Sequence, residues 1–170
     1  MNGKIYGWDD IYPETRNYLK MEKDVASGGY AYRWPVSGNK LSLELISREN
    51  RTLRFFMDII ECKRQSTLLV GMRGDRKTTM QTRCSDTPLI RIDYSEQPDS
   101  IRHLNPNGLM VVGTHVHLDL DGRGLKWAFP LSEQDIILPG DEESVPALFW
   151  AFQDACNITR ALIMEQSLGV

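Results

Sequence analysis

The chain has 170 residues, of which 41% are hydrophobic and 25% charged, and its formal net charge is −3. This composition is typical of a folded globular protein, and it excludes a disordered chain and a strongly basic protein that coats nucleic acid. No apolar run approaches the ~20 residues that cross a bilayer, and the three cysteines form no CxxC pair, so we expect a cytoplasmic protein with reduced thiols and no membrane contact.

Charge is unevenly distributed along the chain. Residues 48–91 hold ten Lys or Arg against five Asp or Glu, whereas residues 92–170 hold four against twelve. A local basic surface that binds phosphate is therefore compatible with the acidic total. A solvated charged face is the plainer explanation of such a run.

In chain order, the first expected element is a helix over residues 13–24, because it begins with a proline in its first turn and a Gly-Gly pair follows it. Residues 41–47 alternate apolar and polar side chains, as a half-buried strand does. Residues 51–61 are rich in aromatic and β-branched residues, which also favour a strand. Residues 48–51 are the expected hairpin turn between the two.

Further strands are expected in the middle of the chain, where strand-like stretches alternate with the turn-like sequences RGD, SDTP and GRG. The loop EQPDSIRHLNPNG separates two of them. The expected strands cover residues 67–72, 76–84, 89–95, 109–121 and 126–131.

Near the C-terminus the apolar residues recur every three to four positions, which predicts an amphipathic helix over residues 144–166. Successive strands followed by a terminal helix predict a single α+β domain over residues 1–170, with a mostly antiparallel sheet and this helix packed on one face. Its expected parts are an N-terminal segment (1–48) with a short helix and the first strand, a sheet (49–131), and the helix.

Alternate residues of a strand share a face, and this rule collects polar side chains on three successive strands. In HVHLDLD it places His115 and His117 together with Asp119 and Asp121. If the three strands are neighbours, their apolar faces would pack on the C-terminal helix. An antiparallel sheet often has one solvated face, so this pattern alone does not establish a site. The shared polar face would hold Lys77, Gln81, Arg83, Arg91, Asp93, His115 and His117.

The first function that suits this face is metal-independent cleavage of a phosphodiester. His115 and His117 would act as an acid/base pair, because histidine titrates near neutral pH. Arg83 and Arg91 would clamp the phosphate, since the guanidinium fork matches its oxygens, and Asp93 would orient these groups. The hypothesis requires the two histidines and the two arginines to converge in one concave site. Additional substrate contacts are expected from Lys77 and, by stacking on a base, from Trp127.

Two other functions remain open. In a metal-dependent hydrolase, His115 and His117 would share one divalent ion, with Asp93 or Asp119 as a third ligand and His103 within reach from its loop. In a binding module without chemistry, the basic region would face an acidic partner or a nucleic acid, and the histidines would only form hydrogen bonds. The sequence does not define the oligomeric state.

Several motifs occur in a fixed order: TMQTR, LIRIDYS, HLNPNG, GTHVHLDLDGRGLKWAFPL and ALFWAFQDACNI. Together they resemble a family of uncharacterised small bacterial and prophage proteins, a domain of unknown function, over residues 50–160. The sequence departs from that pattern at Asn107, where Asp is usual, and in a longer loop before His103. The resemblance marks Gln81, Arg83, Arg91, Asp93, His103, Asn105, Gly108, His115, His117, Trp127 and Asn157, and it implies that Gln81, His103 and Asn105 contact the substrate.

The order of these residues is also similar to that of TumE-like toxins of toxin–antitoxin pairs, which are regarded as RNases. This likeness implies an RNase-like toxin, or another defence- or prophage-associated protein, that acts on RNA or a nucleotide and is partnered by an antitoxin. The alternative is a non-enzymatic binding or inhibitor protein whose partner is a phage or host protein. The resemblance marks the two histidines more than Asp119 and Asp121, which we expect to belong to the following turn.

Overall fold

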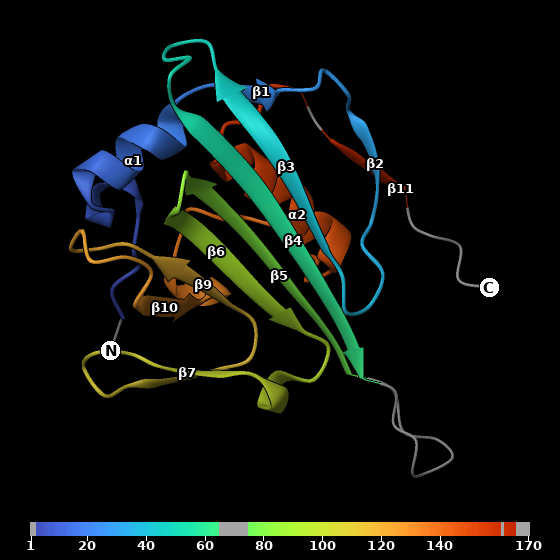
Figure 1. The fold of residues 1–170 in the computed structure, drawn as a ribbon. Helices are drawn as coiled ribbons and strands as arrows, with labels where there is room; N and C mark the ends of the chain where they lie inside the picture. Colours follow the sequence, from blue (N-terminus) through green and yellow to red (C-terminus); the bar gives the residue numbers. More distant parts are fainter. Residues whose placement is uncertain (1–2, 65–74, 161, 166–170) are drawn as a thin grey trace.

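A seven-stranded antiparallel sheet forms the centre of the fold (Figure 1). The computed structural model describes residues 3–64, 75–160 and 162–165. The four central strands have 8 to 11 residues each and pair in chain order, whereas the strands at the two edges of the sheet have three or four residues. Across the sheet the strands lie in the order β1 (Lys23–Val25), β3 (Lys40–Ser47), β4 (Arg54–Arg64), β5 (Asp75–Cys84), β6 (Thr87–Ser95), β9 (His115–Leu118) and β10 (Trp127–Pro130).

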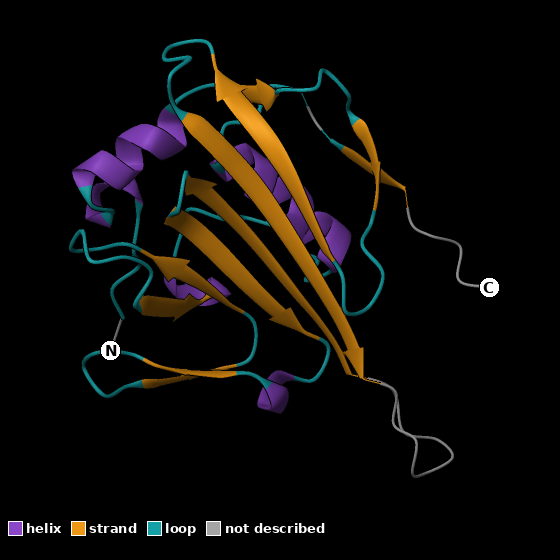
Figure 2. Ribbon diagram, viewed as in Figure 1, coloured by secondary structure: helices purple, strands orange, loops and turns teal. Residues whose placement is uncertain are grey.

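Two helices and two small ribbons complete the fold. Helix α2 lies behind the sheet in the view of Figure 2, and none of the described helices is long and apolar enough to cross a membrane. One ribbon is parallel and the other is an antiparallel hairpin beside the sheet. The elements are α1 (Pro13–Lys20), α2 (Val145–Ala155), the parallel pair β2 (Ala31–Arg33) and β11 (Ile163–Glu165), the hairpin β7 (Arg102–Leu104) and β8 (Met110–Val112), and 3₁₀ turns at Trp8–Asp10, Pro98–Ser100 and Leu131–Glu133.

One face of the sheet and α2 enclose the hydrophobic core. Strand alternation turns every second side chain of β3, β4, β5, β6 and β9 toward the helix, whose apolar stripe faces the sheet. The predicted α+β domain, with a mostly antiparallel sheet and a terminal helix on one face, is therefore confirmed. The sheet contributes Leu43, Leu45, Phe55, Met57, Ile59, Met80, Ile90, Ile92, Val116 and Leu118, and the helical stripe contributes Val145, Leu148, Phe149, Phe152 and Cys156.

Both predicted helices are too long. Helix α1 ends at Lys20, because the chain turns there to pair β1 with β3. Helix α2 ends at Ala155 instead of residue 166, since Asn157 adopts a left-handed conformation (φ 52°) of the kind that terminates helices. The following residues reach β2 and add the short strand β11 to it.

The strand predicted over residues 109–121 is in fact two strands in different sheets. Gly113 separates β8 from β9, and its φ of 86° is a left-handed conformation that a strand residue cannot keep. The predicted hairpin between β3 and β4 is confirmed. The strand predicted over residues 67–72 lies outside the described residues.

Lys23 joins the ends of both helices to the sheet. Its side chain is 1% exposed, and Nζ donates hydrogen bonds to the carbonyl oxygens of Leu19 (3.0 Å), Met21 (2.8 Å) and Cys156 (2.9 Å). Burial lowers the pKa of Lys23 to about 8, so the ammonium group still holds its proton at neutral pH. Its three N–H donors then match three carbonyl acceptors.

Candidate functional site

Three neighbouring strands bring the predicted polar residues onto the face opposite the core. The pairing of β6 with β9 places Arg91 opposite His117 and Asp93 opposite His115. On the other side of β6, β5 places Thr79 opposite Asp93. The prediction that these three strands are neighbours is therefore confirmed. Their pairing places an arginine, an aspartate and two histidines at adjacent positions of the sheet.

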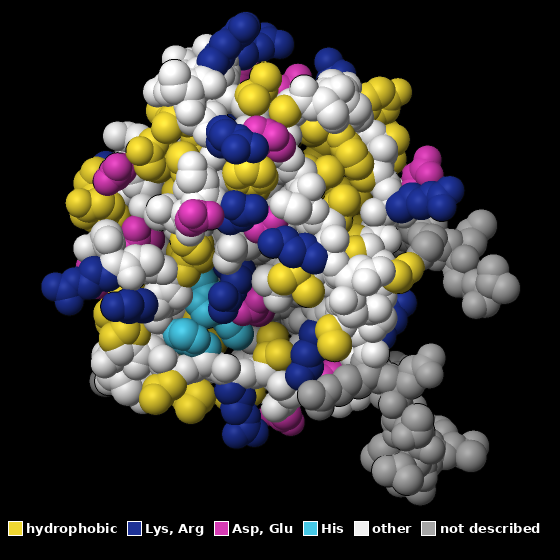
Figure 3. All heavy atoms as spheres, viewed as in Figure 1, with side chains coloured by type: hydrophobic (Ala, Val, Ile, Leu, Met, Phe, Trp, Pro, Cys, Tyr) yellow, Lys and Arg dark blue, Asp and Glu magenta, His cyan; other side chains and the backbone are white. Residues whose placement is uncertain are grey.

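This face is hollowed into a cleft of about 530 Å³, bounded on one side by the segment that leads into β7. Figure 3 shows the histidine side chains in this hollow, with Lys and Arg side chains nearby. The charged residues that line it are Lys77, Arg91 and Arg102 against a single carboxylate, Asp93. A cleft with more cations than anions attracts an anionic ligand such as a phosphate.

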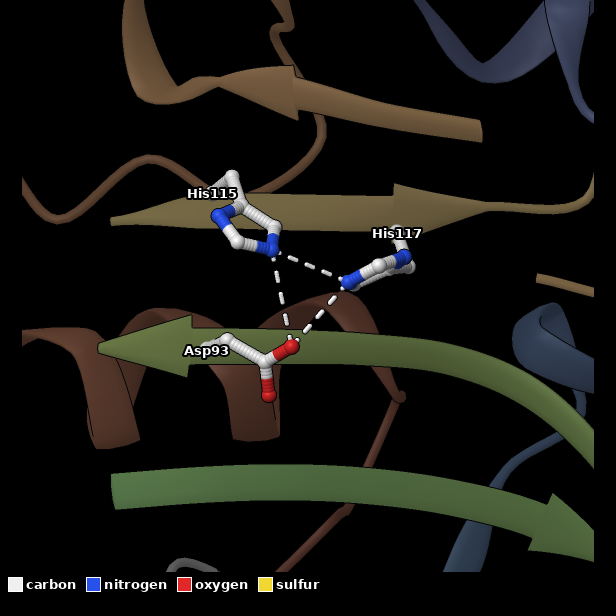
Figure 4. Close-up of side chains that lie close together, drawn as sticks. All are labelled: Asp93, His115 and His117. Atoms are coloured by element: carbon white, nitrogen blue, oxygen red, sulfur yellow. Dashed lines mark hydrogen bonds and ion pairs between the residues drawn. The ribbon is translucent and has the colours of Figure 1, made fainter. Parts of the chain in front are cut away.

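On the cleft floor, Asp93, His115 and His117 point toward one another (Figure 4). Asp93 Oδ2 lies 3.0 Å from His117 Nε2 and 3.5 Å from His115 Nε2, and the two Nε2 atoms are 3.0 Å apart. The rings are deep, since His115 is 2% and His117 0% exposed. Three potential ligand atoms thus meet at one point below the cleft surface.

The opposite ring nitrogens fix how each imidazole is protonated. His115 Nδ1 lies 2.6 Å from the carbonyl oxygen of Gly113, and His117 Nδ1 lies 3.2 Å from that of Leu125. A carbonyl oxygen only accepts, so both Nδ1 atoms donate. Arg91 Nη2, which only donates, lies 2.9 Å from His117 Nε2. His117 is therefore neutral, with the lone pair of Nε2 directed at the cluster.

Asp93 is held from both of its oxygens. Oδ1 accepts from Thr79 Oγ1 at 2.8 Å, and Oδ2 accepts from Arg91 Nε at 3.1 Å and lies 3.0 Å from Arg91 Nη2. Burial opposes ionisation, but the contact with His115 and the charge of Arg91 outweigh it and hold the pKa of Asp93 far below its usual value. The carboxylate is thus ionised at every physiological pH.

The pKa of His117 is also lowered. Burial, helped by the charge of Arg91, lowers the pKa of His117 below its ordinary value although Asp93 acts against this change. The neutral form that the hydrogen bonds require is therefore also the form that the electrostatics favour.

These two pKa shifts predict a fold that loses stability in acid. Below pH ~6.5 the unfolded chain binds a proton on His117 that the folded protein does not, so the free energy of unfolding falls as the pH falls. Below pH ~4 Asp93 adds a second loss, because its carboxyl group is protonated in the unfolded chain first. Thermal melts from pH 7.5 to 3.5 with a chelator present should show both losses, and Asp93→Asn should reduce the second, with the remainder due to other carboxyl groups of lowered pKa such as Asp58 and Asp75. A melting temperature independent of pH would contradict this electrostatic description.

The predicted accessory His103 does reach the cleft, although it lies in β7 and not in a loop. Its ring centroid is 4.6 Å from that of His117, and its Nε2 lies 2.8 Å from the carbonyl oxygen of Lys126. The buried Asn105 side chain bonds both the N–H and the C=O of Ala128, at 2.8 and 2.9 Å. Asn105 therefore anchors the hairpin to β10 and positions His103, and it does not present its amide to the cleft.

Arg83 does not join the site. Its Nε donates to Asp58 Oδ2 at 2.8 Å, and its guanidinium carbon lies 4.1 Å from the ring centroid of Phe56. Arg83 pairs with Pro88 of β6, whereas Thr79 pairs with Asp93, so Arg83 lies farther along β5 than the cleft. The predicted convergence of two arginines with two histidines is therefore wrong for Arg83, and the metal-independent mechanism with a clamp of two arginines, which required it, is not supported in that form. Among the described residues, those that line the cleft include Lys77, Arg91, Asp93, His103, His115 and His117 but not Gln81, Arg83, Asn105 or Trp127.

The two aspartates after the histidines serve the turn, as predicted. Asp119 Oδ2 accepts from Thr15 Oγ1 at 2.7 Å and its Oδ1 from the N–H of Gly122 at 2.8 Å, while Asp121 accepts from the N–H of Arg123 at 3.1 Å. Asp119 thus fastens α1 to the turn and is not placed to be a third metal ligand.

Four features of the site were not predicted from the sequence, and the first is Arg102 of β7, which lines the cleft. Thr79 stands between predicted face residues in the alternation of β5, so its position was readable although its bond to Asp93 was not. The carbonyl groups of Gly113 and Leu125 orient the two imidazoles, and a backbone carbonyl leaves no trace in the residue types.

Comparison with known proteins gave one match. A family model described as a family of unknown function (DUF6978) matches residues 13–158, which is most of the chain and all of the cleft. Searches of curated proteins and of solved structures gave no match.

Proposed function

The chain belongs to this family of unknown function, and we propose that it is an RNase-like enzyme that acts on a phosphodiester of RNA or of a nucleotide in the cleft. The observation that carries the proposal is the convergence of Asp93, His115 and His117 beneath a rim of cations. Residues whose pKa values are strongly shifted, gathered in a concave site, are typical of catalytic centres.

Each residue has a distinct role in this proposal. Arg91, whose side chain is 34% exposed, offers N–H groups to a phosphate oxygen and stabilises the charge that develops there. Lys77 at the rim contributes less, because its Nζ lies 3.5 Å from Asp75 Oδ2 and donates to the carbonyl oxygen of Ser100 at 2.9 Å.

The imidazole rings of His115 and His117 are almost wholly buried, so they would act on the substrate through a group bound at their Nε2 atoms. The role of His115 and His117 as a direct acid/base pair stays a prediction. Their burial argues against direct contact between these two rings and an RNA strand.

A cellular experiment tests the toxin part of the proposal. Induced expression of the wild-type chain in bacterial cytoplasm is expected to arrest growth, because cleavage of cellular RNA stops protein synthesis. Asp93→Asn, which is nearly isosteric, should remove the arrest at an equal level of folded protein. Normal growth with abundant folded wild-type protein would overturn the toxin role while leaving cleavage in vitro as a separate question.

A second candidate function, binding of an antitoxin or of a phage or host protein, is favoured by the β7–β8 hairpin. Its outer face exposes four apolar side chains beside the cleft, which is typical of an interaction surface. The exposed fractions are 59% for Leu104, 65% for Leu109, 53% for Met110 and 44% for Val112.

The hairpin can be tested separately from the cleft. Met110→Lys should weaken binding to the product of the adjacent gene by about 10-fold or more, since a charge would be buried at the interface, and it should leave RNA cleavage unchanged. Ile46→Lys, at an exposed apolar position on β3, is the matched control. Equal binding by both variants in a calorimetric titration would reject the hairpin as the interface.

A further inference from the structure

We propose that Asp93, His115 and His117 bind one divalent transition-metal ion through Oδ2, Nε2 and Nε2. The separations of the three atoms, 3.0, 3.0 and 3.5 Å, are those expected of ligands on one face of an ion. In a tetrahedral site with bonds of about 2.05 Å, neighbouring ligand atoms lie about 3.3 Å apart. In an octahedral site with bonds of about 2.1 Å they lie about 3.0 Å apart.

Every ligand has a partner that orients it, as is usual in protein metal sites. The Nδ1 atoms of His115 and His117 donate to the carbonyl groups of Gly113 and Leu125, so in the neutral form of each ring the Nε2 lone pair faces inward. Asp93 Oδ1 accepts from Thr79, which leaves Oδ2 for the shared point. These supports come from three different chain segments, and they aim all three lone pairs at one position.

When both imidazoles are neutral, the three inward lone pairs repel one another unless a positive charge lies between them. A shared proton would join only two of the three atoms, whereas a metal ion satisfies all three at once. Arg91 now supplies donors to Asp93 Oδ2 and to His117 Nε2. Because its side chain is partly exposed at the cleft, the guanidinium has room to turn outward when an ion occupies the point, and there it faces the phosphate.

The ligand types define the class of ion. Two imidazoles with one carboxylate suit Zn²⁺, Mn²⁺, Fe²⁺ or Co²⁺ better than Mg²⁺ or Ca²⁺, which prefer oxygen ligands. Three protein ligands leave open positions toward the cleft for water or a phosphate oxygen. This ion deepens the proposed function and rests on it only for its chemical role, since binding itself needs no substrate.

Metal uptake by the full chain tests the inference without RNA. Protein stripped with a chelator is titrated calorimetrically with Zn²⁺ and, separately, with Mn²⁺, and bound metal is counted by mass spectrometry after dialysis. We expect one ion per chain and a raised melting temperature. Asp93→Asn should weaken binding by more than about 100-fold, and Thr79→Val by about 10–100-fold, the usual cost of a lost supporting contact.

Asp121→Asn is the matched control, because it makes the same change at an exposed carboxylate in the turn after β9, which is not one of the three ligands, and it should leave the affinity unchanged. Circular dichroism and thermal melts establish that each variant is folded. Absence of stoichiometric uptake of either ion by folded wild-type protein, or uptake that Asp93→Asn does not weaken, would overturn the inference. Cleavage of RNA by metal-free protein would overturn the role of the ion in the reaction and keep the proposed function, whereas uptake of the ion without cleavage would contradict the proposed function and keep the metal site.

Discussion

Replacement of Arg91 by Ala is expected to lower kcat/KM for RNA cleavage by about 10²–10³-fold, the usual cost of losing one donor that stabilises charge at a reacting centre. Arg91 is the cation that contacts both Asp93 and His117, and its side chain reaches the cleft surface. Arg91→Lys should restore only part of the rate, because an ammonium group cannot make the paired N–H contacts of a guanidinium. Initial rates on a fluorescent RNA oligonucleotide measure both effects.

Arg83→Ala is the matched control for this prediction. The same residue type on the neighbouring strand is held by Asp58 outside the cleft, so its loss should leave kcat/KM within about 2-fold if the fold is intact. Equal losses in the two variants would mean that a general positive field, and not the Arg91 contacts, supports the reaction. An unchanged kcat/KM in Arg91→Ala would show that Arg91 does not take part in the reaction.

Lys23→Met should destabilise the fold by about 3–5 kcal/mol, the largest effect that we expect on stability. The variant keeps an apolar side chain of similar length but leaves the buried carbonyl groups of Leu19, Met21 and Cys156 without their shared donor. Each buried acceptor that loses its partner costs about 1–3 kcal/mol, and water cannot easily enter a position that is 1% exposed. For a chain of this size the melting temperature should fall by roughly 6–20 °C.

Lys20→Met makes the same chemical change at an exposed position on α1 and should shift stability by less than about 0.5 kcal/mol. Urea denaturation followed by circular dichroism gives both free energies. A Lys23→Met variant as stable as Lys20→Met would show that the three carbonyl contacts contribute nothing and that α1, β1 and α2 are joined by packing alone.

Strand alternation was sufficient to predict the face that carries the site. Because successive strands with short turns become neighbours, the alternation in β5, β6 and β9 predicts that Arg91, Asp93, His115 and His117 share one face, and the strand register confirms it. The helical stripe in α2 and its packing on the opposite face followed from the same kind of periodicity. Periodicity works here because β6 and β9 each have one apolar side and one polar side.

Alternation could not reveal where an element ends. The sequence predicts one continuous strand at the point where Gly113 separates two. The pattern of residue types does not distinguish a glycine with an extended backbone from one with a left-handed backbone. Asn157 stops α2 through its left-handed backbone, although apolar residues continue beyond it. In both cases a single φ angle overrides a favourable sequence pattern.

Sequence also could not decide which cation serves the cleft. Arg83 and Arg91 face the same side of neighbouring strands, and the resemblance to a family marks both. Asp58 on β4 lies within 2.8 Å of Arg83 and neutralises it, whereas Asp93 holds Arg91 beside His117. The difference depends on which carboxylate each arginine meets across the strand pairs, and that requires the register of the whole sheet.

The most direct test of the central claim is cleavage of a single-stranded RNA oligonucleotide by the purified full chain, read on a denaturing gel with and without added Mn²⁺ or Zn²⁺. The account predicts that the wild-type protein cuts the RNA in at least one of these conditions. It also predicts that Asp93→Asn, folded by circular dichroism, cuts at least about 10³-fold more slowly, while Arg83→Ala cuts normally. RNA left intact by folded wild-type protein in every condition, or cut equally fast by Asp93→Asn, would contradict the assignment of this cleft as a phosphodiester-directed active site.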